Sequence, residues 1–421
     1  FAVYFHPPYA KRGGFGDHGE SGPNRPEKLM LLKYANALRD PVLYWQSEQI
    51  TPSDGIESKL QVRKEDPDWL EWFVEDVFSV LIPSPVGLEP KSPAGMPGSK
   101  WLRDIGWVGM HSALGDAAND VWALFKSSRY GSFSHSHADQ NSFQLNAYGQ
   151  PLLIDSGYYP WFGSPHHNLW TRQTRAHNAV LVNGRGQASS SMAAAGNIGQ
   201  YQYAGKLTLA VGDATAAYNV PMGESTVEQW REILKDLPLP PSGPRATAAR
   251  RALAFSGEGD KAWLAVSDYV AAESPTRFQF LLHALDKLEL DQAGGSVVVT
   301  NGPARCLVKI VSTGSLAFSQ NDRFYTPPEE RYEGAANQWH FTAETTEDAP
   351  FARFVALAVP FRAGEPLPEV KEATEGNLRG FEINGERVSA WWGEGETGAV
   401  EGFEGPGRLF VETADGKYVL K

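Results

Sequence analysis

The stretch GSFSHSHADQNSFQLNAYGQPLLIDSGYYPWFGSPHHNLWTRQTRAHNAVLVNGRGQ, residues 131–187, decides the interpretation of the chain because it concentrates ionisable and aromatic side chains. It holds five of the ten histidines of the chain. On an extended strand, side chains two residues apart point to the same face. We therefore expect a strand that carries His135, His137 and Asp139 on one face of a sheet.

Two further strands are expected in the same stretch. A turn at residues 148–151 (YGQP) precedes the apolar run LLID, which ends at Asp155, and the run AVLV begins two residues after His177. If these strands are neighbours, they present His137, Asp155 and His177 around one point. Two imidazoles and one carboxylate form a ligand set that suits zinc.

The ordered run HSHADQNSF…LLIDSGYY…TRQTRAHNAVLVNGRGQ resembles the signature of the heparinase II/III-like polysaccharide lyases. That family includes heparin and heparan sulfate lyases as well as alginate and oligoalginate lyases. The resemblance is dense over residues 131–187 and looser elsewhere, from FGD at 15–17 to FLLHAL at 280–285. It implies a lyase that cleaves uronic-acid-containing anionic polysaccharide by β-elimination. It also implies an α+β fold in which the end of an (α/α) toroid precedes a large antiparallel β-sandwich.

The resemblance assigns roles to individual residues. It implies that His135 is catalytic and that His137, Asp155 and His177 bind a zinc ion that is structural rather than water-activating. Elimination requires that the uronate carboxylate be neutralised, that a base reach the C5 proton and that the leaving oxygen be protonated. In this family a tyrosine and a neutralising asparagine or histidine come from the toroid, and we expect both to lie upstream of Phe1.

Three more side chains are candidates to bind the substrate. Arg172 and Arg175 lie close to the expected metal strand, and a guanidinium matches carboxylate and sulfate geometry. Tyr158 lies on the intervening loop and is a candidate to stack on a sugar ring. Surface ion pairs would account for the arginines equally well. We expect His166 and His167, on the same loop, to be solvated.

The histidine and aspartate pattern also fits roles that involve no zinc. Asp155 alternatively caps the turn before Ser156-Gly157, and His177 alternatively lies beside a metal without binding it. The same residue types describe the iron ligands of a cupin-like metal oxygenase. A non-catalytic carbohydrate-binding β-sandwich would account for the many aromatic residues but not for the His/Asp set.

Composition bounds the class of protein. The chain has 421 residues, 42% of them hydrophobic, with 42 glycines and 29 prolines, which is typical of turn-rich β structure. The single Cys306 excludes an intramolecular disulfide and a cysteine metal cluster. The net charge of −12 argues against nucleic acid and anionic membranes as partners, and no apolar run reaches the roughly 18 residues that span a bilayer. An acidic sugar remains possible where arginines gather in a cleft.

We expect four regions along the chain. Residues 1–85, with helices at 26–40 and from Asp66 onward, form the end of the toroid, and a Pro/Gly-rich linker covers 86–99. The antiparallel β-sandwich covers 100–361, and a small β unit covers 362–421. Because the first residue is Phe1, we expect a fragment or processed product, and we expect the protein to be periplasmic or secreted.

Overall fold

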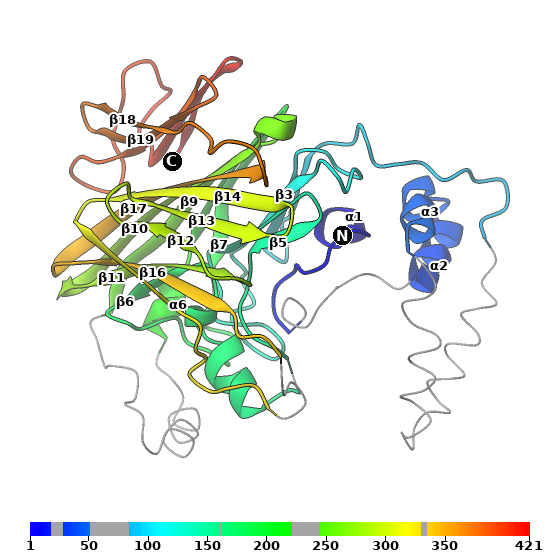
Figure 1. The fold of residues 1–421 in the computed structure, drawn as a ribbon, viewed down its shortest axis with the longest axis horizontal. Coiled ribbons are helices and arrows are strands. Elements are labelled where there is room, and N and C mark those ends of the chain that lie inside the picture. The colour runs from blue at the N-terminus through cyan, green and yellow to red at the C-terminus, as the bar shows by residue number, and fades with distance from the viewer. Residues whose placement is uncertain (18–27, 51–83, 160, 221–244, 330–334) are drawn as a thin grey trace.

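The computed structural model describes residues 1–17, 28–50, 84–159, 161–220, 245–329 and 335–421 (Figure 1). Among the described residues before 84, the helices are α1 (Ala2–Phe5), α2 (Lys28–Leu38) and α3 (Pro41–Glu48). Asp40 caps α3 by accepting hydrogen bonds from the backbone N–H groups of Val42 and Leu43, at 2.8 and 3.1 Å. Helix α2 falls inside the range predicted for the first helix. The helix predicted from Asp66 onward lies outside the described residues.

Beyond residue 98 the described chain is mainly antiparallel β structure. The first sheet is a meander of five strands: β1 (Ser99–Leu102), β2 (Trp107–His111), β3 (Val121–Lys126), β4 (Ser142–Ala147) and β5 (Gln150–Leu153). The predicted turn after β4 is tight because Tyr148 and Gly149 both have positive φ, 55° and 71°. Two successive residues of this kind match the right-handed twist of a two-residue hairpin.

Two more sheets face each other and form the sandwich. The larger has the order β12-β13-β14-β17-β10-β9-β8-β7 and the smaller the order β15-β16-β11-β6. Their strands are β6 (Val180–Val182), β7 (Asn197–Ala204), β8 (Leu207–Asp213), β9 (Ala246–Ser256), β10 (Trp263–Thr276), β11 (Phe278–Ala284), β12 (Glu289–Asp291), β13 (Ser296–Asn301), β14 (Ala304–Ser312), β15 (Leu316–Asn321), β16 (Trp339–Thr345) and β17 (Ala349–Arg362). Short helical turns lie at η2 (His167–Thr171), η3 (Thr174–Ala176), α6 (Thr215–Asn219) and η4 (Gly259–Lys261).

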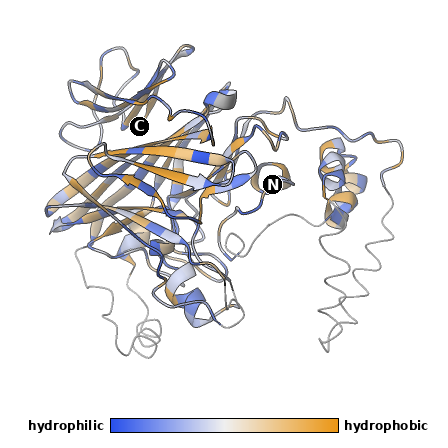
Figure 2. Cartoon of the chain, in the orientation of Figure 1, coloured by the Kyte–Doolittle hydropathy of each residue, from blue (hydrophilic) through white to orange (hydrophobic). Residues whose placement is uncertain are grey.

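One apolar core joins these sheets. Leu264 of β10 and Phe280 of β11 meet in it, and Phe143 of the first sheet belongs to the same cluster. Figure 2 shows the apolar character of the strands that enclose this core. The antiparallel β-sandwich predicted for this part of the chain is therefore confirmed.

The last sixty residues form a sheet of their own, here called the C-terminal sheet. Its strands are β18 (Lys371–Glu375), β19 (Leu378–Ile383), β20 (Glu386–Trp391), β21 (Leu409–Thr413) and β22 (Gly416–Leu420). Asn384 and Gly385, both with positive φ, make the turn between β19 and β20. Phe381 and Val411 pack with Leu357 of β17, so the C-terminal sheet covers the outer face of the eight-stranded sheet (Figure 1).

The structure corrects the strand expected over His135–Asp139. Residues 131–141 form turns, with Ser134 and Asn141 at φ values of 56° and 63°, and β4 begins only at Ser142. Side chains satisfy the backbone of this loop in place of a strand partner. Gln140, for example, donates to the carbonyl of Gly131 and accepts from the N–H of Ser128, at 3.1 and 2.6 Å.

The expected row of three neighbouring strands is also wrong. Strands β4 and β5 belong to the first sheet, whereas β6 pairs with β11 in the four-stranded sheet. The chain passes from one sheet to the other just after β5, where the N–H of Ile154 donates to the carbonyl of His283 at 3.0 Å. The candidate residues therefore meet where loops connect two sheets.

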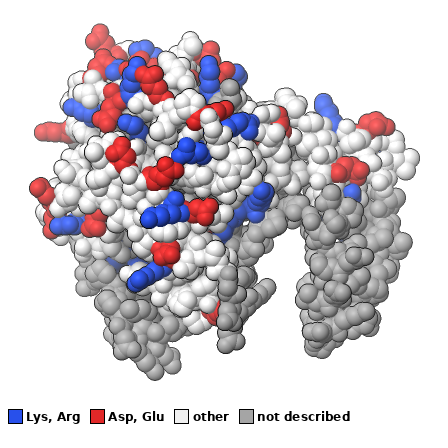
Figure 3. All heavy atoms as spheres, in the orientation of Figure 1, with Lys and Arg blue, Asp and Glu red and all other residues white. Residues whose placement is uncertain are grey.

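Surface charge is mixed on the face drawn in Figure 3. Basic and acidic side chains are interspersed there and gather most densely over the C-terminal sheet at the top. Among the described residues, no helix combines the length and the apolar character needed to cross a membrane.

Candidate functional site

An aspartate from the N-terminal segment lies at the centre of the histidine-rich loops. The backbone N–H of Asp17 donates to the carbonyl of His135 at 3.2 Å. The preceding Gly16 has a φ of 82°, and a Cβ on it would lie 2.4 Å from the same carbonyl oxygen. Glycine is therefore required for this close approach of two backbone segments.

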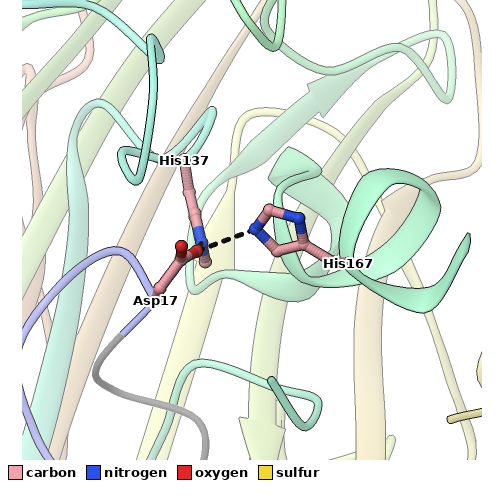
Figure 4. A group of neighbouring side chains, drawn as sticks. All are labelled: Asp17, His137 and His167. Carbon is pink, nitrogen blue, oxygen red and sulfur yellow. Dashed lines mark hydrogen bonds and ion pairs between the residues drawn. The ribbon is translucent and has the colours of Figure 1, made fainter. Parts of the chain in front are cut away.

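Three imidazoles converge on the Asp17 carboxylate. The Nε2 atoms of His137 and His167 each lie 2.8 Å from its Oδ1, and Nδ1 of His135 lies 2.5 Å from its Oδ2. Figure 4 shows the rings of His137 and His167 turned toward the carboxylate. We call Asp17, His135, His137 and His167 the Asp17 group. Burial tends to raise the pKa of Asp17, but the hydrogen bonds from the histidines outweigh it and lower the pKa below its usual range.

Hydrogen bonding fixes which nitrogen of His167 carries the proton. The backbone N–H of Gly163 donates to Nδ1 of His167 at 2.9 Å, so this nitrogen is an acceptor. A neutral imidazole has one donor and one acceptor nitrogen, and Nε2 must therefore donate to Asp17. His167 thus has no lone pair to offer a metal in this arrangement.

His135 differs from the other histidines of the Asp17 group in its exposure. Its side chain is 66% exposed, whereas those of His137 and His167 are fully buried. Because Nδ1 of His135 points at Asp17, Nε2 lies at the opposite end of the ring. The Phe162 ring lies beside it, with centroids 5.2 Å apart. A buried carboxylate that holds one ring nitrogen fixes the tautomer and orientation of the imidazole.

A second cluster lies next to the first. Asp139, Asp155 and His177, here called the Asp155 group, are buried and offer ligand atoms that all lie within 4.8 Å of one another. Nδ1 of His177 lies 3.0 Å from Oδ1 of Asp155, and Nε2 of His177 lies 3.0 Å from the carbonyl of Thr171. Since Nε2 donates to that carbonyl, a protonated ring donates to Asp155 through Nδ1, whereas a neutral ring presents Nδ1 as an acceptor.

The Asp155 group contains an unsatisfied acceptor. In the part of the chain that the structure describes, Oδ2 of Asp139 is buried and has no hydrogen-bond partner, whereas Oδ1 of Asp155 is paired with Nδ1 of His177. Burial tends to lower the pKa of His177, but the charges of Asp155 and Asp139 raise it above its ordinary value. A proton on His177 supplies a positive charge beside Asp155, and a bound cation would do the same for a neutral ring.

His137 lies between the two groups. Its ring centroid is 5.4 Å from that of His177 and 6.0 Å from that of His167. Burial lowers the pKa of His137 to about 3, so the ring is neutral near pH 7. The structure therefore places His137 beside His177 and His177 beside Asp155, but the ligand atoms within 4.8 Å of one another are those of Asp17, His137 and His167 in one group and of Asp139, Asp155 and His177 in the other. Loops rather than neighbouring strands position these residues.

The model of the family "Heparinase II/III-like, C-terminal" matches residues 94–369. The chain belongs to this family. Its fold resembles that of a heparinase III (TM-score 0.58, 12% identity, 99% of this chain and 52% of the other) and of the heparan sulfate lyase HepC from Pedobacter heparinus (TM-score 0.56, 16% identity, 91% and 50%). The chain spans about half the length of these solved structures, and no curated protein matches it.

In this heparinase II/III-like chain, the three side chains predicted to bind substrate differ in burial and in the residues that they contact. The guanidinium of Arg172 is buried and donates to the carbonyls of Ser132 and Ser136, at 2.9 and 3.5 Å, so it supports the loop that carries His135. Arg175 is partly exposed, with its guanidinium 4.3 Å from the centroid of Tyr325. The hydroxyl of Tyr158 donates to the carbonyl of Ala336 at 2.6 Å.

Residue patterns alone missed Asp17 and His167 as members of the Asp17 group. His166 and His167 were expected to be solvated, and this is wrong, because both are buried. The short helical turn η2 folds His167 inward, and Nδ1 of His166 lies 2.5 Å from the carbonyl of Thr326. Asp17 was overlooked because it lies 118 residues from His135, although the looser FGD match contained it.

Proposed function

We propose that this chain is the β-sandwich part of a polysaccharide lyase that cleaves uronic-acid-containing anionic polysaccharide by β-elimination. Alginate and heparin or heparan-type chains are the substrate classes to test. The contact between exposed His135 and buried Asp17 carries the proposal, since it holds a solvent-facing imidazole in one orientation. Membership of the heparinase II/III-like family supports it.

His135 would act on the uronate through Nε2. The C5 proton of a uronate is weakly acidic because the adjacent carboxylate is already negative. An imidazole with Nδ1 held by Asp17 can donate to that carboxylate or transfer a proton near it. We expect the other catalytic side chains, a tyrosine and an asparagine or histidine, on an (α/α) toroid of which residues 1–85 would be the end.

Zinc is the proposed cofactor, with His137, Asp155 and His177 as ligands. Nε2 of His137 donates to Asp17 and Nε2 of His177 donates to Thr171, so both rings would use Nδ1. Ligating histidines commonly donate their second ring nitrogen to a carboxylate or carbonyl in this way. The buried oxygen of Asp139 that has no hydrogen-bond partner among the described residues fits a cation. When bound, the ion would neutralise this acceptor and link the loops below His135.

Substrate binding is proposed for Arg175 and Tyr158. Arg175 is partly exposed and would contact an acidic group of the sugar, and Tyr158 would lie along the same loop. Arg172 would act by holding the His135 loop. A lyase of this kind acts on polysaccharide outside the cytoplasm, so we propose a periplasmic or secreted location.

The test is a screen of uronic-acid polysaccharides for the absorbance of the unsaturated product. The chain is assayed as it stands and with its upstream coding sequence restored. New absorbance that His135→Ala abolishes and Lys206→Ala leaves unchanged supports the proposal, because Lys206 lies in an exposed ion pair with Glu258. No product from any uronate polymer with the extended protein would refute it.

A second candidate function is carbohydrate binding without catalysis. Phe133, Trp161 and Phe162 are large apolar side chains that are at least half exposed, and Phe162 contacts His135. Exposed aromatic rings can stack on sugars. Saturable binding of a polysaccharide by the extended protein without any turnover would favour this function. Tightly held iron with oxygen-dependent turnover would instead favour the cupin-like alternative.

A further inference from the structure

We propose that Asp139 is a fourth metal ligand and that the ammonium of Lys126 weakens metal binding at this site. The inference rests on the metal site proposed above and not on the lyase chemistry. It adds a ligand to His137, Asp155 and His177, and it assigns a role to a buried lysine.

The two carboxylate oxygens of Asp139 have different surroundings. Oδ1 accepts a hydrogen bond from the ammonium of Lys126, whereas Oδ2 has no hydrogen-bond partner among the described residues. Asp139 is fully buried and belongs to the group whose ligand atoms lie within 4.8 Å of one another. One oxygen is thus held by Lys126, the other has no hydrogen-bond partner among the described residues, and the carboxylate lies in the same group as Asp155 and His177. This is the arrangement expected of a ligand whose orientation is fixed by a second contact.

Lys126 is buried at the end of β3, with 2% of its side chain exposed, and its ammonium lies 5.8 Å from the centroid of Phe15. A buried ammonium requires a paired carboxylate, and Asp139 provides it. The same positive charge repels a divalent cation bound at the other oxygen of Asp139. Repulsion between charges is strong where water is excluded, so Lys126 lowers the affinity of the group for a metal ion.

The experiment measures zinc affinity by competition with a chromogenic chelator, using the full chain stripped of metal. Lys126→Met is compared with the wild type, and with Asp139→Asn/Lys126→Met. The double variant removes both charges, because Asp139→Asn alone leaves a buried ammonium unpaired and is expected to destabilise the fold. Lys206→Met, which breaks an exposed ion pair, is the control. Melting temperatures with and without zinc are recorded for each protein.

We expect Lys126→Met to bind zinc more tightly than the wild type and to gain more thermal stability from zinc. The double variant should bind zinc on the order of 10–100-fold more weakly than Lys126→Met, which is typical when a residue of a metal site is lost. Equal affinities of the two variants would overturn the assignment of Asp139. Unchanged or weaker binding by Lys126→Met would overturn the role of Lys126. Absence of zinc binding by every protein would refute the metal site, while the assay of polysaccharide cleavage would still test the lyase.

Discussion

The Asp17 group and the Asp155 group contain the same residue types but differ in how their polar atoms are matched. Around Asp17, each of three imidazoles offers a nitrogen to the carboxylate, at 2.5–2.8 Å. In the Asp155 group, Lys126 donates to one oxygen of Asp139 and Gln144 donates to one oxygen of Asp155, while the other oxygen of Asp139 has no hydrogen-bond partner among the described residues. The first arrangement satisfies itself by hydrogen bonds, whereas the second leaves a buried carboxylate oxygen for which we propose a bound cation. Residue type alone therefore does not distinguish a positioning site from a metal site.

The two groups also differ in their access to solvent. The Asp17 group includes His135, whose side chain is 66% exposed, while Asp139, Asp155 and His177 are all buried. A substrate can reach only the first group. We infer that chemistry takes place at His135 and that the Asp155 group stabilises the loops beneath it. The first three of the following predictions test this division.

The largest expected effect is that of His135→Ala on the extended enzyme. Loss of one positioned acid–base group typically costs about 10²–10⁴-fold in rate. The variant should keep its melting temperature and its zinc content, because the His135 side chain is exposed and lies outside the Asp155 group. Near-normal elimination, or a loss explained by unfolding, would remove His135 from the mechanism.

Asp17→Asn should reduce turnover less than His135→Ala does, because Asp17 acts through the orientation of His135. NMR of ¹⁵N-labelled histidine provides a readout that activity does not. In the wild type the proton of neutral His135 should be held on Nδ1, and in the variant this preference should weaken. An unchanged tautomer would show that Asp17 does not position His135.

Metal removal should change stability in a way that depends on the Asp155 group. A ligand that binds only the folded state raises the melting temperature with its concentration. Treatment with a chelator should therefore lower the melting temperature of the wild type, and His137→Ala should lower both stability and activity. The double variant Asp155→Asn/His177→Ala should not respond to the chelator. A response equal to that of the wild type would place the metal elsewhere.

His340, which lies outside both groups, should make the stability of the protein depend on pH. It is hydrogen-bonded to Ser156 at 2.9 Å, and burial lowers its pKa to about 4. The unfolded chain, with an ordinary pKa of about 6.5, binds the proton first as the pH falls. The contribution of His340 to the free energy of unfolding should therefore be fully present above about pH 6.5 and should be lost as the pH falls toward 4. Urea unfolding across this range should show a shallower decline for His340→Gln, and an unchanged slope would refute the assignment.

The smallest effect is expected for Arg175→Ala, which should raise KM modestly and leave the melting temperature near that of the wild type. The side chain is partly exposed and stacks on Tyr325. Arg172→Ala is the informative comparison, because it removes buried hydrogen bonds to the His135 loop and should lower stability. If Arg175→Ala leaves KM unchanged, the arginine does not contact substrate.

Residue patterns predicted the strands well where alternation was regular. Phe278–Ala284 alternates apolar and polar residues at its start, and it forms β11 in the sandwich core. Patterns failed over residues 131–141, because buried polar side chains such as Gln140 replace strand partners there. The alternation of side chains along a strand assumes that neighbouring strands hydrogen-bond its backbone N–H and C=O groups. The backbone of this loop is hydrogen-bonded by side chains instead.

The proximity of His137, Asp155 and His177 could be predicted, whereas the place of Asp17 beside them could not. His137, Asp155 and His177 lie within one contiguous stretch, so short connections bring them together. Asp17 reaches the same place from 118 residues away, which only the folded chain reveals. The burial of His167 depends on the helical turn η2, whose local sequence resembles an exposed loop. Sequence periodicity therefore revealed neither the long-range contact of Asp17 nor the irregular turn that buries His167.

The division between the two groups is tested most directly by locating the metal. Anomalous diffraction at the zinc absorption edge, from crystals of the zinc-loaded protein, shows which side chains bind the ion. We predict one peak at bonding distance from Asp155 and His177, with the Asp17 carboxylate still hydrogen-bonded to His135 and His167. A peak bound by Asp17 and His167, or no peak at either group, would contradict this division.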